Sequence, residues 1–255
     1  MLLAIDMGNT ETVLGVFEGE RLVDHWRVAT VRSRTADEYR LLLSGLLGLG
    51  DLDPKRHLTG ASLATVVPPA MTILERVLLE MVPGPVVTVG PGVKTGIPIL
   101  IDNPKEVGAD RVVNSIAALE KYGSPAVVVD FGTSTNFDIV SRNGEYIGGA
   151  IATGLEVSLD ALVGAAAALR RVELKPPRSP VGKGTVEAMQ SGLLYGHAGM
   201  VDGLIERIVA ELGPDTRTVA TGGLAATVVP HCRSVEVVDE FLTLDGLRIV
   251  YHRNT

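Results

Sequence analysis

The sequence predicts an α/β protein built from two duplicated lobes. Segments that read as strands alternate with segments that read as helices, an order typical of sheets covered by helices. One short signature also occurs twice, each time after an apolar run, at Asp6-Met7-Gly8-Asn9-Thr10 and at Asp130-Phe131-Gly132-Thr133-Ser134-Thr135. A strand–turn–strand pattern follows both copies, so the simplest inference is a repeated lobe on either side of a central cleft.

The first half opens with a three-stranded meander and continues with alternating helices and strands. The strands of the meander are expected at 2–6, 12–17 and 21–28, and later strands at 61–67 and 86–89. Thr35 and Glu38 form a capping box, which predicts a helix through Leu47. Further helices are expected at 70–81, after Pro68-Pro69, and from Asn103 to the residue before Gly123, because glycine favours the end of a helix.

The second half repeats this order. Strands are expected at 126–130, 136–140, 145–149, 217–220 and 235–238, and helices at 155–169 and, as one or two segments, at 185–212. Asn143-Gly144 is typical of a type I′ hairpin turn. The alanines at 165–168 allow another helix to pack closely, either within the chain or from a second subunit. We therefore divide the chain into lobes 1–123 and 124–255, joined near Gly123-Ser124-Pro125.

Composition and charge exclude several classes of function. Apolar residues make up 46% of the chain, and the net charge is −7 with a sequence pI of about 5.3. An acidic surface repels nucleic acids and anionic membranes, so neither is an expected partner. Cys232 is the single cysteine, which agrees with a reducing compartment. The first apolar run reaches Asp6 too soon for a signal peptide, and no run is long enough to span a bilayer, so we expect a cytoplasmic protein.

The Asp6 loop is a candidate phosphate site. Asp6 could hold a metal ion through water, while Gly8, Asn9 and Thr10 could present donors to phosphate oxygens. A β-turn also accounts for Gly and Asn, and for one loop alone that interpretation would be favoured. The second copy of the signature reverses the preference, and two such loops facing each other would suit ATP.

The Asp130 loop carries the hydroxyls of Thr133, Ser134 and Thr135, which resemble a phosphate-facing cluster but are also ordinary strand formers. Asp130 itself ends an all-apolar strand. A buried carboxylate needs a cation or hydrogen-bond donors, and a hard cation fits this kind of oxygen ligand.

A third group, Gly108-Ala109-Asp110-Arg111, lies near the start of a predicted helix. Asp110 suits the positive end of the helix dipole, whereas Arg111 does not and is better explained by an anionic ligand or a carboxylate. A carboxylate beside a substrate hydroxyl is the usual base in hydroxyl phosphorylation. A helix-start Asp followed by a solvated Arg is an equally acceptable interpretation.

Other motifs carry less information. Thr221-Gly222-Gly223 could let an adenine pack against the backbone, but a tight strand-to-helix turn is favoured. Thr185 could be only a helix N-cap. Gly92-Val93-Lys94-Thr95 lacks the glycine that a P-loop has before its lysine, which disfavours a P-loop kinase. The five histidines have no metal-ligand spacing.

Together these residues resemble the type III pantothenate kinases, which belong to the acetate kinase/Hsp70/actin-like superfamily. The resemblance runs nearly end to end. Besides both signatures it includes the segments Trp26-Arg27, Thr35–Tyr39, Val66–Pro69, Gly90–Gly96, Asn103–Arg111, Gly148-Gly149, Gly182–Thr185, Gln190–Gly192, Ala220–Gly223 and Phe241–Leu247. It implies actin-like (ribonuclease H-like) lobes, each a mixed sheet flanked by helices.

The resemblance also implies ATP-dependent phosphorylation of pantothenate and a role for each matching residue. Asp110 would accept the proton of the substrate hydroxyl, and Gly108, Ala109, Asp110 and Arg111 would line the pantothenate pocket. The residues implied in ATP binding are Asp6, Met7, Gly8, Asn9, Thr10, Glu11, Thr12, Val13 and Thr133. Mg²⁺ would accompany ATP, and Asp130 would bind the monovalent cation, K⁺ or NH₄⁺, that the family requires.

Thr185 would complete the pocket of the neighbouring subunit, which implies an obligate homodimer. Ile101 stands where relatives usually have a tyrosine that contacts pantothenate, so this chain departs from the family there. Two alternatives stay open: a regulator that kept the fold with weakened catalysis, and an actin-like polymer. Retention of Asp6, Asp110, Arg111 and Asp130 argues against the regulator, and the short chain disfavours the polymer.

Overall fold

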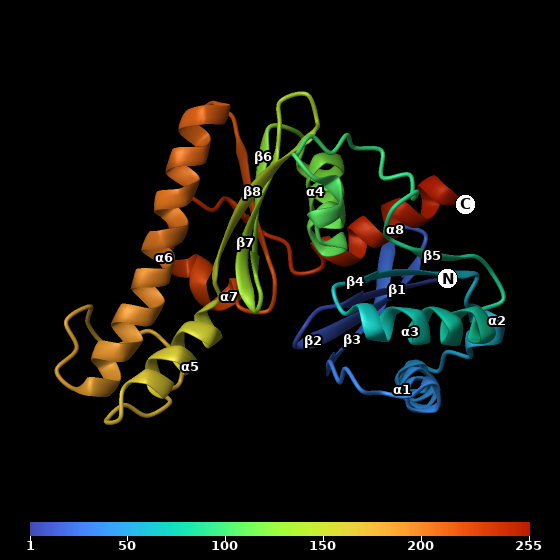
Figure 1. Cartoon of the computed structure of the whole chain (residues 1–255), viewed down its shortest axis with the longest axis horizontal. Helices are drawn as coiled ribbons and strands as arrows, with labels where there is room; N and C mark the ends of the chain where they lie inside the picture. Colours follow the sequence, from blue (N-terminus) through green and yellow to red (C-terminus); the bar gives the residue numbers. More distant parts are fainter. The chain divides into compact units, whose positions relative to one another are not determined.

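A computed structural model describes residues 1–255 (Figure 1). The chain forms two compact units. The first unit contains Met1–Pro98, Asp102–Ala117 and Leu242–Thr255, and the second contains Ile99–Ile101 and Ala118–Phe241. The chain was expected to divide once, after residue 123, but Leu242–Thr255 belong to the first unit.

The first unit is built on a mixed sheet. Its strands are β1 (Leu2–Met7), β2 (Glu11–Glu18), β3 (Arg21–Ala29), β4 (Gly60–Thr65) and β5 (Val86–Thr88). They lie in the order β3-β2-β1-β4-β5. β1, β2 and β3 form the expected antiparallel meander, and β4 and β5 continue the sheet in parallel with β1.

Helices cover both faces of this sheet. Its main helices are α1 (Ala36–Leu49), α3 (Pro68–Met81) and α8 (Leu242–Asn254), and the short α2 (Pro54–His57) precedes β4. α1 and α3 bury Leu43 and Leu74 against strand residues such as Ile5, while α8 lies on the opposite side (Figure 1). Close approach of α8 requires glycine: a Cβ on Gly60 would lie 1.8 Å from the Tyr251 hydroxyl oxygen.

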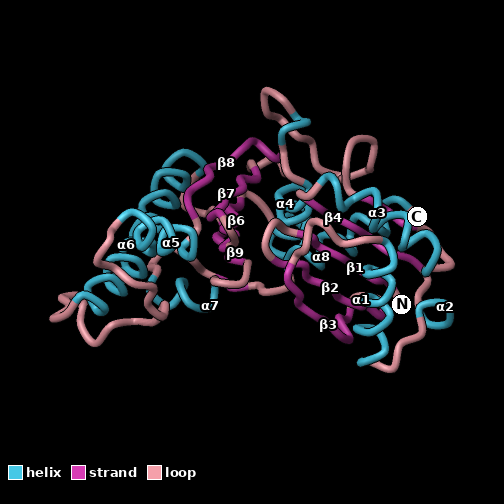
Figure 2. Tube along the Cα trace, turned by 60° about the horizontal axis from the view of Figure 1, so that its bottom comes forward, coloured by secondary structure: helices cyan, strands magenta, loops and turns pink.

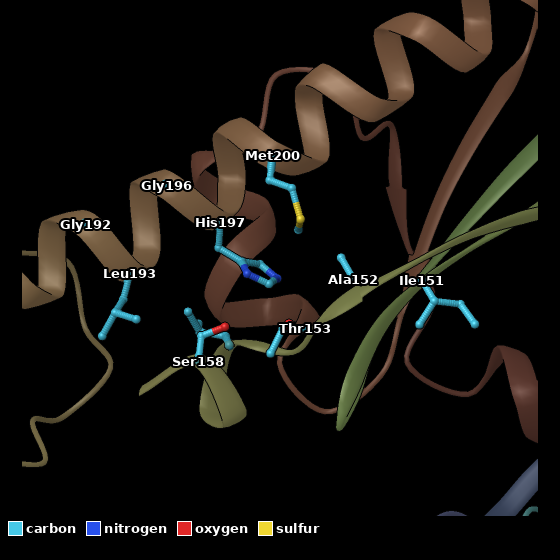
Figure 3. Close-up of a pocket in the computed structure, with 10 residues that line it drawn as sticks. Ile151, Ala152, Thr153, Ser158, Gly192, Leu193, Gly196, His197 and Met200 are labelled. Atoms are coloured by element: carbon cyan, nitrogen blue, oxygen red, sulfur yellow. The ribbon is translucent and has the colours of Figure 1, made fainter. Parts of the chain in front are cut away.

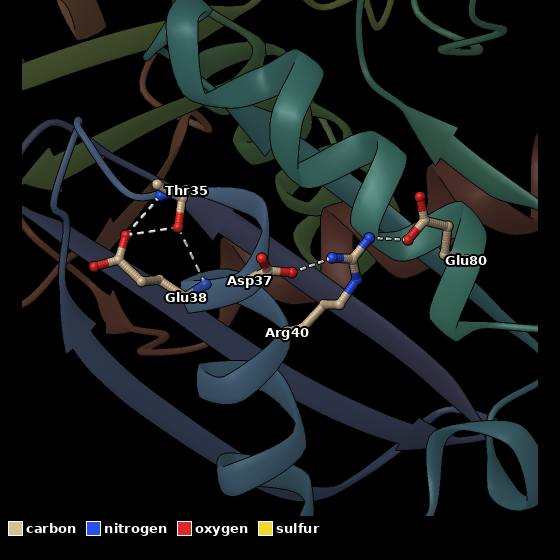
Figure 4. A network of polar contacts seen from close by, with 5 residues as sticks. All are labelled: Thr35, Asp37, Glu38, Arg40 and Glu80. Atoms are coloured by element: carbon tan, nitrogen blue, oxygen red, sulfur yellow. Dashed lines mark hydrogen bonds and ion pairs between the residues drawn. The ribbon is translucent and has the colours of Figure 1, made fainter.

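The capping box predicted at Thr35 is confirmed. The Glu38 N–H donates to Thr35 Oγ1 at 3.4 Å, and the Thr35 N–H donates to the Glu38 carboxylate at 2.7 Å. Arg40, one turn further along α1, forms ion pairs with Asp37 and with Glu80 of α3 (Figure 4). These contacts fix the start of α1 and join it to the neighbouring helix.

The second unit repeats the topology of the first. Its strands are β6 (Ala126–Phe131), β7 (Ser134–Val140), β8 (Tyr146–Thr153), β9 (Arg217–Thr221) and β10 (Val237–Val238). Read from β8, their order is β8-β7-β6-β9-β10, which matches β3-β2-β1-β4-β5 strand for strand. The sequence prediction of an α/β fold with duplicated mixed sheets is therefore confirmed.

One face of the second sheet is covered by α5 (Leu155–Ala165), α6 (Thr185–Leu212) and α7 (Ala225–Val228) (Figure 2). A short 3₁₀ turn, Val229–His231, follows α7. Buried Phe131 and Phe137 of the sheet pack with Leu194 and Val201 of α6. The helix expected from Asn103 begins only at Ala109: α4 (Ala109–Tyr122) follows a separate 3₁₀ turn at Pro104–Glu106. None of the helices has the length and apolar character needed to cross a membrane.

Three further local predictions about turns and helix ends were wrong. The type I′ turn at Asn143-Gly144 is not formed, because only Gly144 has a positive φ (76°). The Ser141 hydroxyl accepts hydrogen bonds from the N–H groups of Asn143 and Glu145, which favours another turn within the expected hairpin. The helix expected at 155–169 ends at Ala165, since Arg171 pairs with Glu156 and Asp160 of α5 and the chain folds back. Pro68 and Pro69 do not precede α3 but form its first turn, where proline is tolerated.

Candidate active site

The Asp6 loop lies at the edge of the first sheet where β1 and β4 both end. The two strands run parallel with Met7 opposite Thr65, and the Val66 N–H donates to the Met7 carbonyl at 3.2 Å. In open α/β sheets, ligands bind at the carboxyl ends of the strands. The predicted phosphate loop therefore occupies the edge at which a ligand is expected.

Asp110 lies at the same edge of the first unit. Gly108 packs beside the residue that follows β4, because a Cβ on Gly108 would lie 3.5 Å from Val66 Cγ1. Asp110 is the second residue of α4, and its Oδ1 accepts the Arg111 N–H at 2.9 Å. The structure thus brings together the Asp6 and Asp110 segments, which are distant in the sequence.

Burial changes the chemistry of Asp110. It raises the pKa of the carboxyl above its ordinary value of 3.8, and the hydrogen bond from the Arg111 N–H and the charge of Arg111 oppose this shift only in part. A carboxylate with a raised pKa is a stronger proton acceptor than an exposed one. The Asp110 side chain is therefore suited to take a proton from a bound hydroxyl.

Both copies of the signature use their glycine in the same way. The Gly8 N–H donates to the Glu11 carbonyl at 2.9 Å, and the Gly132 N–H donates to the Ser134 carbonyl at 3.0 Å. Each glycine closes the turn between the first two strands of its sheet, so its own N–H is occupied within the loop. The β-turn interpretation therefore accounts for both glycines. A ligand at either loop would be bound by the side chains of the loop rather than by these two N–H groups.

The Asp130 loop is enclosed by two other glycines of the second unit. Gly222 has a φ of 92°, and a Cβ there would lie 2.5 Å from Asp130 Oδ1 and 2.6 Å from the Phe131 nitrogen. A Cβ on Gly154, between β8 and α5, would lie 2.4 Å from the Thr133 carbonyl oxygen. Gly222 was singled out from the sequence, and the structure agrees with a tight turn. The role of Gly154 had no local sequence signal.

The Asp130 loop contains carboxylate and carbonyl oxygens, the kinds of ligand that hard cations prefer. Two of its carbonyls also accept hydrogen bonds within the unit, that of Phe131 from the Leu224 N–H at 3.3 Å and that of Thr133 from the Gly154 N–H at 3.2 Å. No group of three or more His, Cys, Asp or Glu side chains could hold a metal ion. A magnesium ion that arrives with ATP needs no such group, because one or two carboxylates and the phosphates suffice.

Thr185 lies elsewhere in the second unit. It is the first residue of α6, and the N-cap is Gly184, so the N-cap interpretation of Thr185 was wrong. His197 of α6 contacts Thr135 Oγ1 at 2.9 Å, and it is twelve residues, about 18 Å, further along the helix axis. The structure does not bring Thr185 to the Asp130 loop within this unit.

A cavity of about 490 Å³ opens among β8, α5 and α6 and is lined by none of the predicted site residues (Figure 3). His197, Thr153, Ser158 and Met200 are among its lining residues. Burial lowers the pKa of His197, so its imidazole is neutral near pH 7.

The single cysteine has no chemical role at this site. Burial raises the pKa of Cys232 to about 11, which makes this thiol unreactive.

Comparisons with known proteins identify the family. The model of the type III pantothenate kinase family matches residues 2–207. A type III pantothenate kinase of Frankia alni is 55% identical over 255 residues, covering all of both chains. The chain belongs to the type III pantothenate kinase family. The resemblance predicted from the two signatures and the segments between them is confirmed.

Solved structures that resemble this type III pantothenate kinase chain share its fold at low sequence identity. A Campylobacter jejuni protein described as a Baf family transcriptional activator has a TM-score of 0.59 at 16% identity and covers 99% of this chain and 98% of its own. A Listeria monocytogenes protein described as an N-acetylmannosamine kinase has a TM-score of 0.52 at 14% identity and covers 99% and 98%. At these identities the likeness extends to the α/β architecture alone.

Proposed function

We propose that this protein transfers the γ-phosphoryl group of ATP to pantothenate and forms 4′-phosphopantothenate, the first step toward coenzyme A. The observation that carries the proposal is the joint placement of the Asp6 loop and Asp110 at one edge of the first sheet. A phosphate-binding loop next to a partly buried carboxylate is suited to phosphorylation of a hydroxyl. Family membership supports the choice of pantothenate as that hydroxyl compound.

Asp110 acts as the base in this proposal. The substrate oxygen forms a bond to the γ-phosphorus while its proton passes to the Asp110 carboxylate, and the bond between that phosphorus and ADP breaks. Gly108, Ala109 and Arg111 line the pantothenate pocket, where the guanidinium of Arg111 pairs with the pantothenate carboxylate. The segment from Asp6 to Val13 and Thr133 bind ATP.

Two kinds of cation accompany the reaction. Mg²⁺ enters with ATP, where it neutralises phosphate charge. Asp130 binds a monovalent cation, K⁺ or NH₄⁺, and the carbonyls next to it and the enclosing Gly222 support that assignment. When bound, the cation would supply positive charge, and oxygen atoms of the Asp130 loop would hold it.

A second copy of the chain completes the site through Thr185, so the protein is a homodimer. Thr185 is exposed at the start of α6. It is twelve residues along this helix from His197, the residue that contacts Thr135. A side chain at the exposed end of a long helix is well placed to reach a neighbouring subunit. The enzyme acts in the cytoplasm, in agreement with its single cysteine.

The experiment that tests the function is a pantothenate phosphorylation assay with ATP and Mg²⁺, in KCl and in NaCl at equal ionic strength. We expect phosphopantothenate in KCl and markedly slower turnover in NaCl, because an oxygen site shaped for K⁺ fits the smaller Na⁺ poorly. Mass spectrometry identifies the product. A folded protein that forms no phosphopantothenate in either salt, or with NH₄Cl in place of KCl, would contradict the kinase proposal and favour the regulator.

The pH dependence of kcat/KM tests the role of Asp110. A base works only when ionised, and burial raises the pKa of Asp110. Activity should therefore fall as the pH drops through a value above 3.8, the ordinary pKa of aspartate, and the acid limb should lie at a higher pH than an exposed aspartate would give. An acid limb at or below the ordinary value would argue that Asp110 is not the base.

A further inference from the structure

Arg32 lies in a short segment that connects β3 to α1 and is held at both ends. On one side, the Thr30 N–H donates to the Thr10 carbonyl at 2.8 Å, and Thr30 Oγ1 lies 2.8 Å from Thr12 Oγ1. On the other side, Thr35 forms the capping box of α1 (Figure 4). The connection is therefore anchored directly to the loop that follows Asp6.

Tyr39 of α1 also holds the connection between β3 and α1 in place. Tyr39 is buried, and its hydroxyl lies 4.0 Å from Met7 Sδ at the end of β1. The guanidinium of Arg34 lies over the Tyr39 ring, 6.0 Å from its centre. Thr30 thus contacts the loop that carries the candidate phosphate site, and Tyr39 links Arg34 to the strand end before that loop.

Arg32 reaches the loop itself through Asn9. Its Nη2 donates to Asn9 Oδ1 at 3.1 Å. An amide whose oxygen accepts this bond directs its NH₂ group elsewhere, so the donors of Asn9 remain available to a ligand. The guanidinium has five N–H groups in a planar fork, and one bond to Asn9 leaves others for a second acceptor.

The charges around the loop point to an anion as that acceptor. Other arginines of β2–β3 and α1 are neutralised by carboxylates: Arg21 by Glu18, Arg27 by Glu11, and Arg40 by Asp37 and Glu80. Arg32 is exposed, and it donates a hydrogen bond to the neutral amide of Asn9. In a chain of net charge −7, a guanidinium held at this loop without a carboxylate suits a phosphate.

We propose that Arg32 binds the phosphate groups of the nucleotide and orients Asn9 toward them. The proposal rests on the proposed function, because it assumes that the Asp6 loop binds ATP. It adds a binding residue from the β3–α1 connection, outside both copies of the signature. The planar fork matches phosphate oxygens in two positions, which a lysine cannot do.

The test measures the affinity of the complete protein for ATP, ADP and adenosine by calorimetry, without pantothenate. Arg32→Ala should raise the dissociation constants of ATP and ADP by roughly 10- to 100-fold, the loss expected for a hydrogen bond between charged groups. The affinity for adenosine should stay unchanged, because it carries no phosphate. Arg21→Ala, at the opposite end of β3 and equally exposed, is the matched control and should bind ATP like the wild type.

Two further variants separate charge from positioning. Arg32→Lys keeps the charge, whereas Arg32→Gln keeps a donor for Asn9 without the charge. The lysine variant should bind ATP more tightly than the glutamine variant, and the wild type more tightly than both. If Arg32→Ala or Arg32→Gln binds ATP like a wild-type protein that itself binds ATP, Arg32 does not contact the phosphates. If the wild type binds no ATP, the function proposed above fails, and the role of Arg32 fails with it.

Discussion

Asp110→Asn should lower kcat for pantothenate phosphorylation by roughly 10²- to 10⁴-fold, the usual contribution of a positioned general base. The amide keeps the size of the side chain, and its oxygen can still accept the Arg111 N–H that Asp110 Oδ1 accepts at 2.9 Å. It cannot take up a proton from the substrate hydroxyl. We therefore expect the KM values for ATP and pantothenate to change little, because the lost interaction forms only in the transition state.

The same variant should fold at least as well as the wild type. A carboxyl whose pKa is raised by folding contributes stability that is lost as the pH rises through that pKa, so ionised Asp110 destabilises the protein near pH 7. Asp37→Asn is the matched control, since Asp37 is the second residue of α1 as Asp110 is of α4. Thermal melting and steady-state kinetics of both variants provide the comparison. Normal turnover by a folded Asp110→Asn protein would refute the assignment of the base.

Gly222→Ala should strongly destabilise the protein and reduce its activity. The φ of 92° alone costs an alanine about 1–2 kcal/mol. The added methyl group would also lie 2.5 Å from Asp130 Oδ1 and 2.7 Å from the Phe131 carbonyl oxygen, which forces backbone to move and adds about 1–3 kcal/mol. Because the displaced atoms belong to the Asp130 loop, the stimulation of activity by K⁺ should weaken as well.

Gly92→Ala measures the backbone cost of this φ alone, so its difference from Gly222→Ala gives the steric part. Gly92 has the same φ of 92°, but nothing lies within 4 Å of the position that a Cβ would occupy. Denaturant unfolding should show a loss of about 1–2 kcal/mol for Gly92→Ala and a clearly larger loss for Gly222→Ala. Equal losses would mean that the contact of Gly222 with the Asp130 loop has no energetic consequence.

Much of the fold could be predicted because its signals are local. Apolar runs that end at Asp6 and Asp130 mark the central strands of both sheets, and the capping box at Thr35 fixes the start of α1. The duplication follows from the two signatures, and the matching strand orders confirm it. Features that depend on neighbouring residues along the chain were therefore recovered.

Features that depend on distant contacts were not recovered. α8 carries apolar Leu244, Leu247 and Val250 at helical spacing, but charged residues interrupt them, and its stability comes from packing against the first sheet. The end of α5 is likewise determined by ion pairs with Arg171, which follows it in the chain. No propensity of the residues within these segments reports such contacts.

The candidate site shows the same division. Asp6 and Asp110 were selected for their position at the end of a strand and at the start of a helix, and register and packing bring their segments to one edge. Gly154 and Arg32 lie in unremarkable sequence, and only the fold places them against a functional loop. The contacts of Gly154 and Arg32 with these loops can therefore be recognised only in the three-dimensional structure.

The assignment of α8 to the first unit affects the order in which the chain matures during synthesis. Nearly all of the second unit is continuous, from Ala118 to Phe241, whereas the first unit needs Leu242–Thr255. One face of the first sheet, including the surface over Gly60, stays uncovered until Leu242–Thr255 have been synthesised and have left the ribosome. Domains usually fold in the order in which they are translated. In this chain the first unit begins synthesis first but can complete its fold only after the second unit has been translated. Until then, the nascent chain would expose an apolar surface of the kind that chaperones recognise.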